Sequence, residues 1–347
     1  MCNIAAYVGT QQAAPILLDM IRKQEAFNGG YFTGIATMHE GKIYHAKLAG
    51  NTQQLIDLTE AENLPGNIGI IHSRSKSGGG DSWAHPFIGC RKGEECEAYV
   101  ANGYAGRFSI CDKEYNALAE SLINDGWQLT SKIVAENKNY QTLSDGSTVH
   151  MSDVMCQLIT KNIAEGAAAD RAIADAFCTM PNEIVGLLLS LTETDKIFWG
   201  RINRPMMLSF AEHGAYLGTT ALSFPKDRGE VIALPANSSG YVTKSSFSAS
   251  PFKKAPATVG EISAKHWKSG VDAVRSALKE GSKTFKQIEK EIMLPLFTSG
   301  DCAPNALLGY EVLRSMKEAG EIEIETNMVE GASDGLSAPQ FIINLKE

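Results

Sequence analysis

The stretch Cys2-Asn3-Ile4-Ala5-Ala6-Tyr7-Val8 is the most informative part of this chain. The β-prone run over residues 4–8 predicts a strand that begins just after a cysteine. Removal of Met1, which a small second residue permits, would give Cys2 a free α-amine beside its thiol. An α-amine has a pKa of about 7.7–8.0 and can act as a base near neutral pH. Cys2 is therefore a candidate nucleophile activated by its own amine.

The composition is that of a globular protein. Hydrophobic residues make up 44% and charged residues 21% of the 347 positions, which favours a packed core and, at this length, two domains. The net charge of −8 argues against a nucleic-acid partner. We find no signal peptide and no apolar stretch near the roughly 20 residues that a membrane helix needs, so we expect a cytoplasmic protein.

The cysteine pattern predicts neither disulfides nor a metal site. The seven cysteines include no C-x-x-C pair and show no regular spacing, which is typical of reduced thiols in a cytosolic protein. The sequence also lacks the phosphate-binding pattern G-x-x-x-x-G-K-[ST]. We therefore expect no cofactor and no bound metal.

Hydrophobic patterning predicts an α+β fold, because a block of helices separates two groups of mostly antiparallel strands. The expected helices are at 12–25, 52–60, 113–124, 153–162 and 170–179. The expected strands are at 4–8, 31–38, 42–48, 68–72, 97–101, 184–190, 196–200, 206–210, 215–217, 230–234 and 240–243.

A change in composition marks a second, smaller domain. A segment rich in Ser, Lys and Pro predicts a linker at 248–257 between a domain at 1–247 and another at 258–347. The second part is expected to have helices at 262–278, 285–293 and 305–317, then strands at 321–325 and 340–345, the outline of a winged helix. It has more acidic than basic residues, which favours protein contacts over DNA binding.

Five short motifs, in order, resemble those of the class II glutamine amidotransferases. They are Cys2-Asn3-Ile4, Gly69-Ile70-Ile71-His72-Ser73-Arg74, Ala84-His85-Pro86, Ala101-Asn102-Gly103 and Thr219-Thr220-Ala221. The resemblance covers about residues 2–247 and is strongest to the amidotransferase domain of glucosamine-6-phosphate synthase. It implies a four-layer αββα sandwich of the N-terminal-nucleophile hydrolases. The sugar-isomerase region is not expected, because only about 90 residues follow.

The resemblance also implies a role for each motif residue. Cys2 would attack the side-chain amide of glutamine, releasing ammonia and then glutamate. Asn102 and the Gly103 N–H would stabilise the oxyanion of the tetrahedral intermediate. Arg74 would bind the α-carboxylate of glutamine through its planar, bidentate guanidinium.

Further substrate contacts are expected from a glycine-rich loop and two motif positions. Residues 75–80 would form a mobile lid, with Ser75 and Ser77 at the substrate, and His85 would lie beside them. The family's T-D-S-E motif, whose Asp binds the ammonium of glutamine, is best matched by residues 150–153. This alignment puts Met151 at the Asp position, so either Asp153 or Asp145 would have to substitute, and Asp153 is the candidate substrate ligand. Asp153 could instead serve only as an acid at a helix N-terminus.

Two alternatives to a glutamine amidotransferase remain open. With Met151 in place of an acid, the chain could be a catalytically degenerate module that binds an amino acid and regulates a partner. It could also be an amidohydrolase of the same fold that acts on another amide. If the chain is a glutamine amidotransferase, its expected partners are glutamine and a separate synthase that accepts ammonia. No nucleic acid and no membrane is expected as a partner. Whether the chain forms a homo-oligomer is left open.

Overall fold

Alternate residues of the first strand, β1 (Asn3–Gly9), enter two different hydrophobic cores. Ile4, Ala6 and Val8 pack between two sheets, whereas Ala5 and Tyr7 pack under a layer of helices. A strand buried on both faces has to lie inside a layered structure. The computed structural model has this architecture, and it describes residues 2–346 apart from 77–78, 92, 105–107, 109–111, 135–141, 299 and 334.

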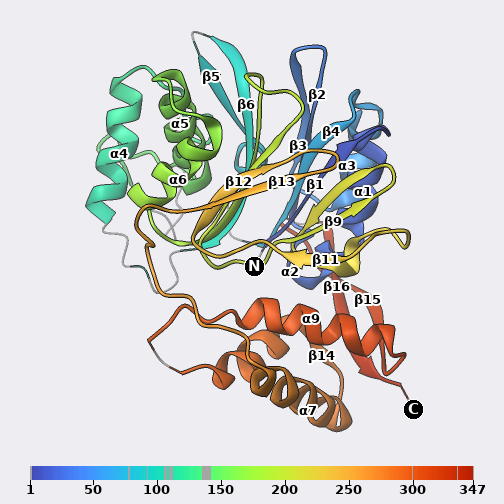
Figure 1. Ribbon diagram of the computed structural model, residues 1–347. Helices are drawn as coiled ribbons and strands as arrows, with labels where there is room; N and C mark the ends of the chain where they lie inside the picture. The colour runs from blue at the N-terminus through green and yellow to red at the C-terminus, as the bar shows by residue number, and fades with distance from the viewer. Residues whose placement is uncertain are drawn as a thin grey trace.

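Two antiparallel sheets pack face to face (Figure 1). The first has the order β11-β9-β10-β1-β4-β2-β3, where the remaining strands are β2 (Phe32–His39), β3 (Lys42–Leu48), β4 (Ile68–Arg74), β9 (Met207–Ala211), β10 (Gly214–Gly218) and β11 (Val231–Ala233). The second has the order β13-β12-β8-β7-β6-β5, made of β5 (Phe87–Arg91), β6 (Glu94–Tyr104), β7 (Glu183–Ser190), β8 (Ile197–Arg201), β12 (Ser238–Val242) and β13 (Phe247–Pro251).

Helices cover the outer face of each sheet, which gives four layers (Figure 1). On the first sheet lie α1 (Ala13–Arg22) and α3 (Thr52–Leu58), with the short α2 (Glu25–Asn28) nearby and 3₁₀ turns at η1 (Ala61–Asn63) and η3 (Ala221–Ser223). On the second lie α4 (Asp112–Asn124), α5 (Met151–Ala164) and α6 (Ala169–Thr179). A further 3₁₀ turn, η2 (Asp81–Trp83), follows β4.

The last part of the chain forms a smaller unit of helices and a three-stranded sheet, ordered β14-β16-β15. Its elements are α7 (Ala264–Glu280), β14 (Lys283–Thr284), α8 (Phe285–Gln287), the π-helix η4 (Ile288–Met293), the 3₁₀ turn η5 (Leu294–Leu296), α9 (Asn305–Glu318), β15 (Ile322–Glu330) and β16 (Ser337–Leu345). Its core also takes in Phe27 of α2, whose ring packs edge-on against Phe285 and Tyr310.

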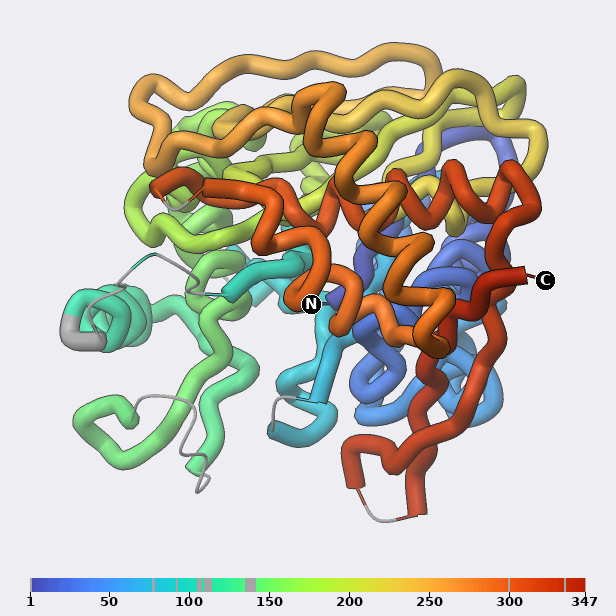
Figure 2. The backbone as a smooth tube through the Cα atoms, turned by 90° about the horizontal axis from the view of Figure 1, so that it is seen from below, coloured from blue at the N-terminus to red at the C-terminus, as the bar shows by residue number. Residues whose placement is uncertain are grey.

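Both backbone views place the N-terminus beside this C-terminal unit (Figures 1 and 2). Tyr310 Oη donates to Asn3 Oδ1 at 3.4 Å, directly behind Cys2. Asn51 Nδ2 donates to Ser337 O at 3.0 Å, and Arg228 pairs with Glu318 at 2.7 Å. The two units are therefore joined by polar contacts as well as by the shared core.

The structure departs from the sequence-based expectations in the second sheet. Residues 247–251 form β13, so the first residues of the predicted linker at 248–257 are part of this strand. β13 is an exposed edge strand and needs no hydrophobic alternation, which is why its Ser-rich sequence resembled a linker. β5 was not predicted either. The division of the chain at 247 and 258 stays a prediction.

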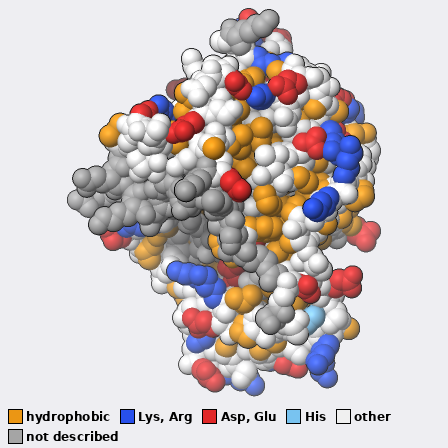
Figure 3. All heavy atoms as spheres, turned by 90° about the vertical axis from the view of Figure 1, so that its left-hand side faces the viewer, with side chains coloured by type: hydrophobic (Ala, Val, Ile, Leu, Met, Phe, Trp, Pro, Cys, Tyr) orange, Lys and Arg blue, Asp and Glu red, His pale blue; other side chains and the backbone are white. Residues whose placement is uncertain are grey.

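Among the described residues, no helix is long and apolar enough to cross a bilayer. On the face drawn in Figure 3, basic and acidic side chains are interspersed around a hydrophobic area.

The buried acid Glu25, beside the first sheet, should make the stability of the protein depend on pH. Glu25 is 4% exposed and accepts hydrogen bonds from Thr52 N, Thr52 Oγ1 and Ser73 Oγ. Burial outweighs these bonds and raises the pKa of Glu25 from 4.5 to about 7. Between these pH values the folded protein binds more protons than the unfolded chain, so this carboxyl's contribution to stability is lost as pH rises.

We therefore expect the free energy of unfolding of the wild type to fall by up to about 3 kcal/mol relative to that of Glu25→Gln as the pH rises from 4.5 to 7. The amide of this variant cannot titrate but retains an oxygen acceptor for Thr52. Urea unfolding of both proteins across this range measures the difference. Parallel pH profiles would contradict the prediction.

Candidate active site

β1 holds Cys2 in place because both neighbours of this strand are also buried strands. β1 pairs with β10 on one side and β4 on the other, with Asn3 opposite Ser73. Ile4 N donates to Thr219 Oγ1 at 2.9 Å, and Thr219 N donates to Ile4 O at 3.0 Å. The Thr219-Thr220 segment therefore fixes the start of β1. Cys2 itself is half-buried.

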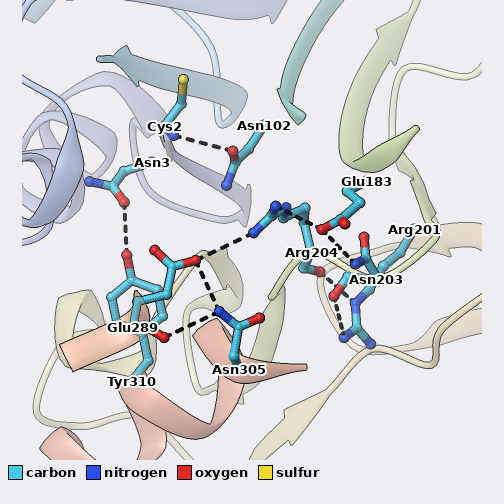
Figure 4. A network of polar contacts seen from close by, with 10 residues as sticks. All are labelled: Cys2, Asn3, Asn102, Glu183, Arg201, Asn203, Arg204, Glu289, Asn305 and Tyr310. Carbon is cyan, nitrogen blue, oxygen red and sulfur yellow. Dashed lines mark hydrogen bonds and ion pairs between the residues drawn. The ribbon is translucent and has the colours of Figure 1, made fainter. Parts of the chain in front are cut away.

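Asn102 links Cys2 to the second sheet. Cys2 N donates to Asn102 Oδ1 at 3.2 Å, as Figure 4 shows. An N–H needs an oxygen acceptor, so this contact sets the direction of the amide. Asn102 is 2% exposed, and among the described residues its Nδ2 has no hydrogen-bond partner. A buried donor is thus available to a ligand on a residue that lines the same cavity as Cys2.

Gly103 and Gly34 allow two close approaches around this point. A Cβ on Gly103 would lie 2.8 Å from Asn182 Oδ1, and one on Gly34 would lie 2.1 Å from His85 O. A side chain at Gly103 would collide with the Asn182 side chain, and one at Gly34 would collide with the backbone of His85. Asn182 and His85 line the cavity, so both glycines help to set its dimensions.

Arg74 ends β4 on the same side as Cys2. Its side chain is 1% exposed, donates from Nη1 to Trp83 O at 2.7 Å and lies over the Phe32 ring, 4.0 Å from the centroid. Ser75 follows it, with Oγ 3.9 Å from Cys2 Sγ. A guanidinium fixed by an aromatic ring and a carbonyl is well placed to bind a carboxylate.

Three buried histidines pack behind Arg74. His72 and His85 stack with ring centroids 3.9 Å apart, and His150 meets His85 edge-on at 5.4 Å. Burial, and then the Arg74 charge, lower the pKa of His72 to about 3. Burial and neighbouring cationic groups also hold the pKa values of His85 and His150 well below their usual range. The three imidazoles are neutral at pH 7.

These groups surround one cavity of about 310 Å³. It brings together Cys2, Arg74, Ser75, His85, Asn102 and Gly103, all of which were predicted from the sequence. Ser77 lies outside the described residues. Ala101, His150, Met151 and Ser152 also line it, and they belong to motifs that the sequence analysis compared with the family, with Met151 at the position of the ammonium-binding Asp. The sequence gave no indication of the other lining residues, which are Tyr104, Met155, Asn182, Ile184, Arg204, Glu289 and Lys290.

Asp153, expected as a substrate ligand, does not line this cavity. Its side chain is fully buried behind the first turn of α5. Oδ2 accepts from Ser131 N at 2.7 Å, and Oδ1 accepts from Gln157 Nε2 at 3.3 Å. Asp153 therefore joins α5 to the preceding segment, and its role as a substrate ligand stays a prediction.

The C-terminal unit supplies part of the cavity wall. Glu289 and Lys290 of η4 line it, and Glu289 Oε1 lies 3.6 Å from Arg204 Nη1. Arg204 also pairs with Glu183 at 2.8 Å, so two acids from different units share one guanidinium (Figure 4). Asn305 Nδ2 donates to Glu289 Oε1 at 3.4 Å. No local pattern in the sequence indicated that these residues meet.

The location of Asp153 predicts a structural role. Asp153→Ala should lower the free energy of unfolding by about 1–3 kcal/mol, because the buried Ser131 N–H loses its acceptor. Asp153→Asn keeps an acceptor oxygen, so its free energy of unfolding should fall by less than that of Asp153→Ala. The KM for an amide substrate should change less than threefold in either variant. Urea unfolding and steady-state kinetics test both points, and a large KM increase in a stably folded variant would restore Asp153 as a substrate ligand.

Comparison with known proteins associates this cavity with a family of amidotransferases. No family model matches the chain. The glutamine–fructose-6-phosphate aminotransferase (isomerizing) of Brucella abortus is 24% identical over 225 residues, which cover 64% of this chain and 32% of that protein. The enzyme of the same name from Pyrococcus horikoshii is 22% identical over 249 residues, which cover 71% and 37%. The chain thus spans about a third of the length of these curated relatives.

Solved structures show the same fold at low identity. Glutamine phosphoribosylpyrophosphate amidotransferase of B. subtilis, complexed with ADP and GMP, superposes with a TM-score of 0.58 at 13% identity, over 93% of this chain and 66% of the other. A structure of the allosteric regulatory enzyme of purine biosynthesis gives a TM-score of 0.60 at 14% identity, over 80% and 58%. The chain therefore has the fold of the N-terminal-nucleophile amidotransferases. In sequence it resembles the class II glutamine amidotransferases, glucosamine-6-phosphate synthase in particular.

Proposed function

We propose that the chain is a class II glutamine amidotransferase-type amidohydrolase, in which Cys2 releases ammonia from the side-chain amide of glutamine. The observation that carries the proposal is the pairing of Cys2 N with Asn102 Oδ1, which leaves Asn102 Nδ2 as a buried donor on a residue that lines the same cavity as Cys2. The names of the curated relatives and the shared fold support the same activity.

The proposed reaction starts after removal of Met1, which makes Cys2 N an α-amine. This amine takes the thiol proton, and Sγ attacks the amide carbon while Arg74 holds the far carboxylate. The carbonyl π electrons move to oxygen, where Asn102 Nδ2 and Gly103 N–H would bind the oxyanion. The C–N bond then breaks, and the leaving nitrogen takes the proton from the amine and departs as ammonia. Water hydrolyses the resulting thioester to glutamate and the thiol.

For the smaller unit we propose a winged-helix-like domain, as part of a division into residues 1–247, a linker at 248–257, and 258–347. Support comes from its element order of helix, strand, two helical segments and two strands, with all three strands in one sheet. Its contribution of Glu289 and Lys290 to the cavity favours a role at the amidotransferase site. We propose that a separate synthase partner accepts the ammonia. The relatives are named as aminotransferases that act on glutamine and fructose 6-phosphate, which supports the use of the ammonia in a further reaction.

Covalent labelling tests the nucleophile. Intact mass should show loss of Met1, and one adduct should form with 6-diazo-5-oxo-norleucine, a glutamine-like alkylating agent. Cys2→Ala should abolish both the adduct and ammonia release, while Cys178→Ala, at an exposed thiol, should change neither. A retained Met1 together with full activity would refute the mechanism, as would an adduct on another cysteine.

Two substitutions separate the donor and acceptor roles of Asn102. Asn102→Ala should lower kcat by roughly 10²–10³ with little change in KM, as loss of an oxyanion donor does in other hydrolases. Asn102→Asp keeps an acceptor for Cys2 N but lacks the Nδ2 donor. Its kcat should therefore fall by at least as much as that of Asn102→Ala. Steady-state ammonia release measures both. Near-normal turnover by Asn102→Asp would show that Asn102 acts only by orienting Cys2.

A further inference from the structure

We infer that this cavity recognises the carboxylate of its substrate but not an ammonium group. Monoamides of dicarboxylic acids that lack the α-amine would then be substrates at least as good as glutamine. The inference rests on the proposed function and concerns which amides that site accepts. It comes from the charges placed around Cys2 Sγ.

The thiol side of the cavity contains a cation. Cys2 Sγ lies 3.9 Å from Ser75 Oγ, and Arg74 is the neighbouring residue in the wall. The buried guanidinium is held over Phe32 and against Trp83 O, so its charge stays in one place. A carboxylate at the far end of an amide substrate would meet a fixed positive charge there.

The carboxylate that does line the cavity lies on its other side. Glu289 shares Arg204 with Glu183 and accepts a hydrogen bond from Asn305. Figure 4 shows Cys2 Sγ pointing away from Glu289 and Arg204. Two acids and one guanidinium satisfy one another there, and Lys290 adds a further positive charge to the wall. Glu289 is therefore poorly placed to pair with an ammonium near Arg74.

Four further side chains that line the cavity are neutral. Met151 and Met155 of α5 line the cavity, and a thioether cannot balance an ammonium. His85 and His150 also line it and are neutral, with pKa values lowered first by burial and then by nearby cationic groups. The carboxylate of Asp153 faces Ser131 N and Gln157, outside the cavity lining. Within the part of the cavity that the structure describes, an ammonium beside Arg74 meets no carboxylate.

The probe is glutaramate, the monoamide of glutaric acid, which differs from glutamine only by lacking the α-amine. We expect kcat/KM for glutaramate to equal or exceed that for glutamine, whereas an enzyme that pairs the ammonium with an acid should favour glutamine roughly tenfold or more. A preference for glutamine above tenfold would overturn the inference while leaving the proposed function intact.

Titration calorimetry on Cys2→Ala measures the binding of each amide without its turnover. Glutaramate should bind this variant at least as tightly as glutamine, and tenfold tighter binding of glutamine would overturn the inference. Absence of Cys2-dependent ammonia release from both amides would refute the proposed function instead. The two failures are therefore distinguishable.

A matched pair of variants tests the cause. Met151→Asp places a carboxylate in the cavity at the start of α5, where the helix dipole favours an acid. In this variant the kcat/KM for glutamine, divided by that for glutaramate, should be at least tenfold higher than in Met151→Asn. Asparagine is the matched control because it has the size of aspartate but no charge. An unchanged ratio would show that recognition does not depend on charge at this position, and would overturn the inference.

Discussion

The hydrogen bond between Cys2 N and Asn102 Oδ1 joins the two sheets at the point where chemistry is proposed. Its geometry depends on β1 being held between β4 and β10, and on β6 being held against β7. Because both strands are buried, neither can shift by one residue without moving its hydrophobic side chains out of their cores. The position of a surface-accessible thiol thus follows from the packing of the whole sandwich.

Much of the cavity lining was predictable because five short motifs resemble those of the class II glutamine amidotransferases. The resemblance, rather than strand periodicity, brought Cys2, Arg74 and Asn102 together, and each of them lies at or next to a strand end. An acid in the first turn of a helix can face outward or inward with the same local sequence, so the sequence alone did not indicate that Asp153 lies outside the cavity lining. Its burial depends on Ser131, which is placed by tertiary packing.

The contribution of the smaller unit could not be predicted in this way. Arg204 and Glu289 are far apart in sequence, and each is an ordinary charged residue in its own segment. Their meeting depends on how two separately patterned units dock, which hydrophobic periodicity does not describe. The same holds for β13, an edge strand with few apolar residues, and for the contact of Tyr310 with Asn3.

The pairing of β1 with β10 also has a consequence for the order of events during synthesis. β1 leaves the ribosome well before its partner, because Gly214–Gly218 lie more than 200 residues further along the chain, and Tyr310 emerges later still. At typical elongation rates of about 5–20 residues per second, the first residues wait roughly 10–40 s before their sheet can close. The segment that precedes β1 therefore stays accessible to processing enzymes while the chain is growing, until this part of the sheet closes.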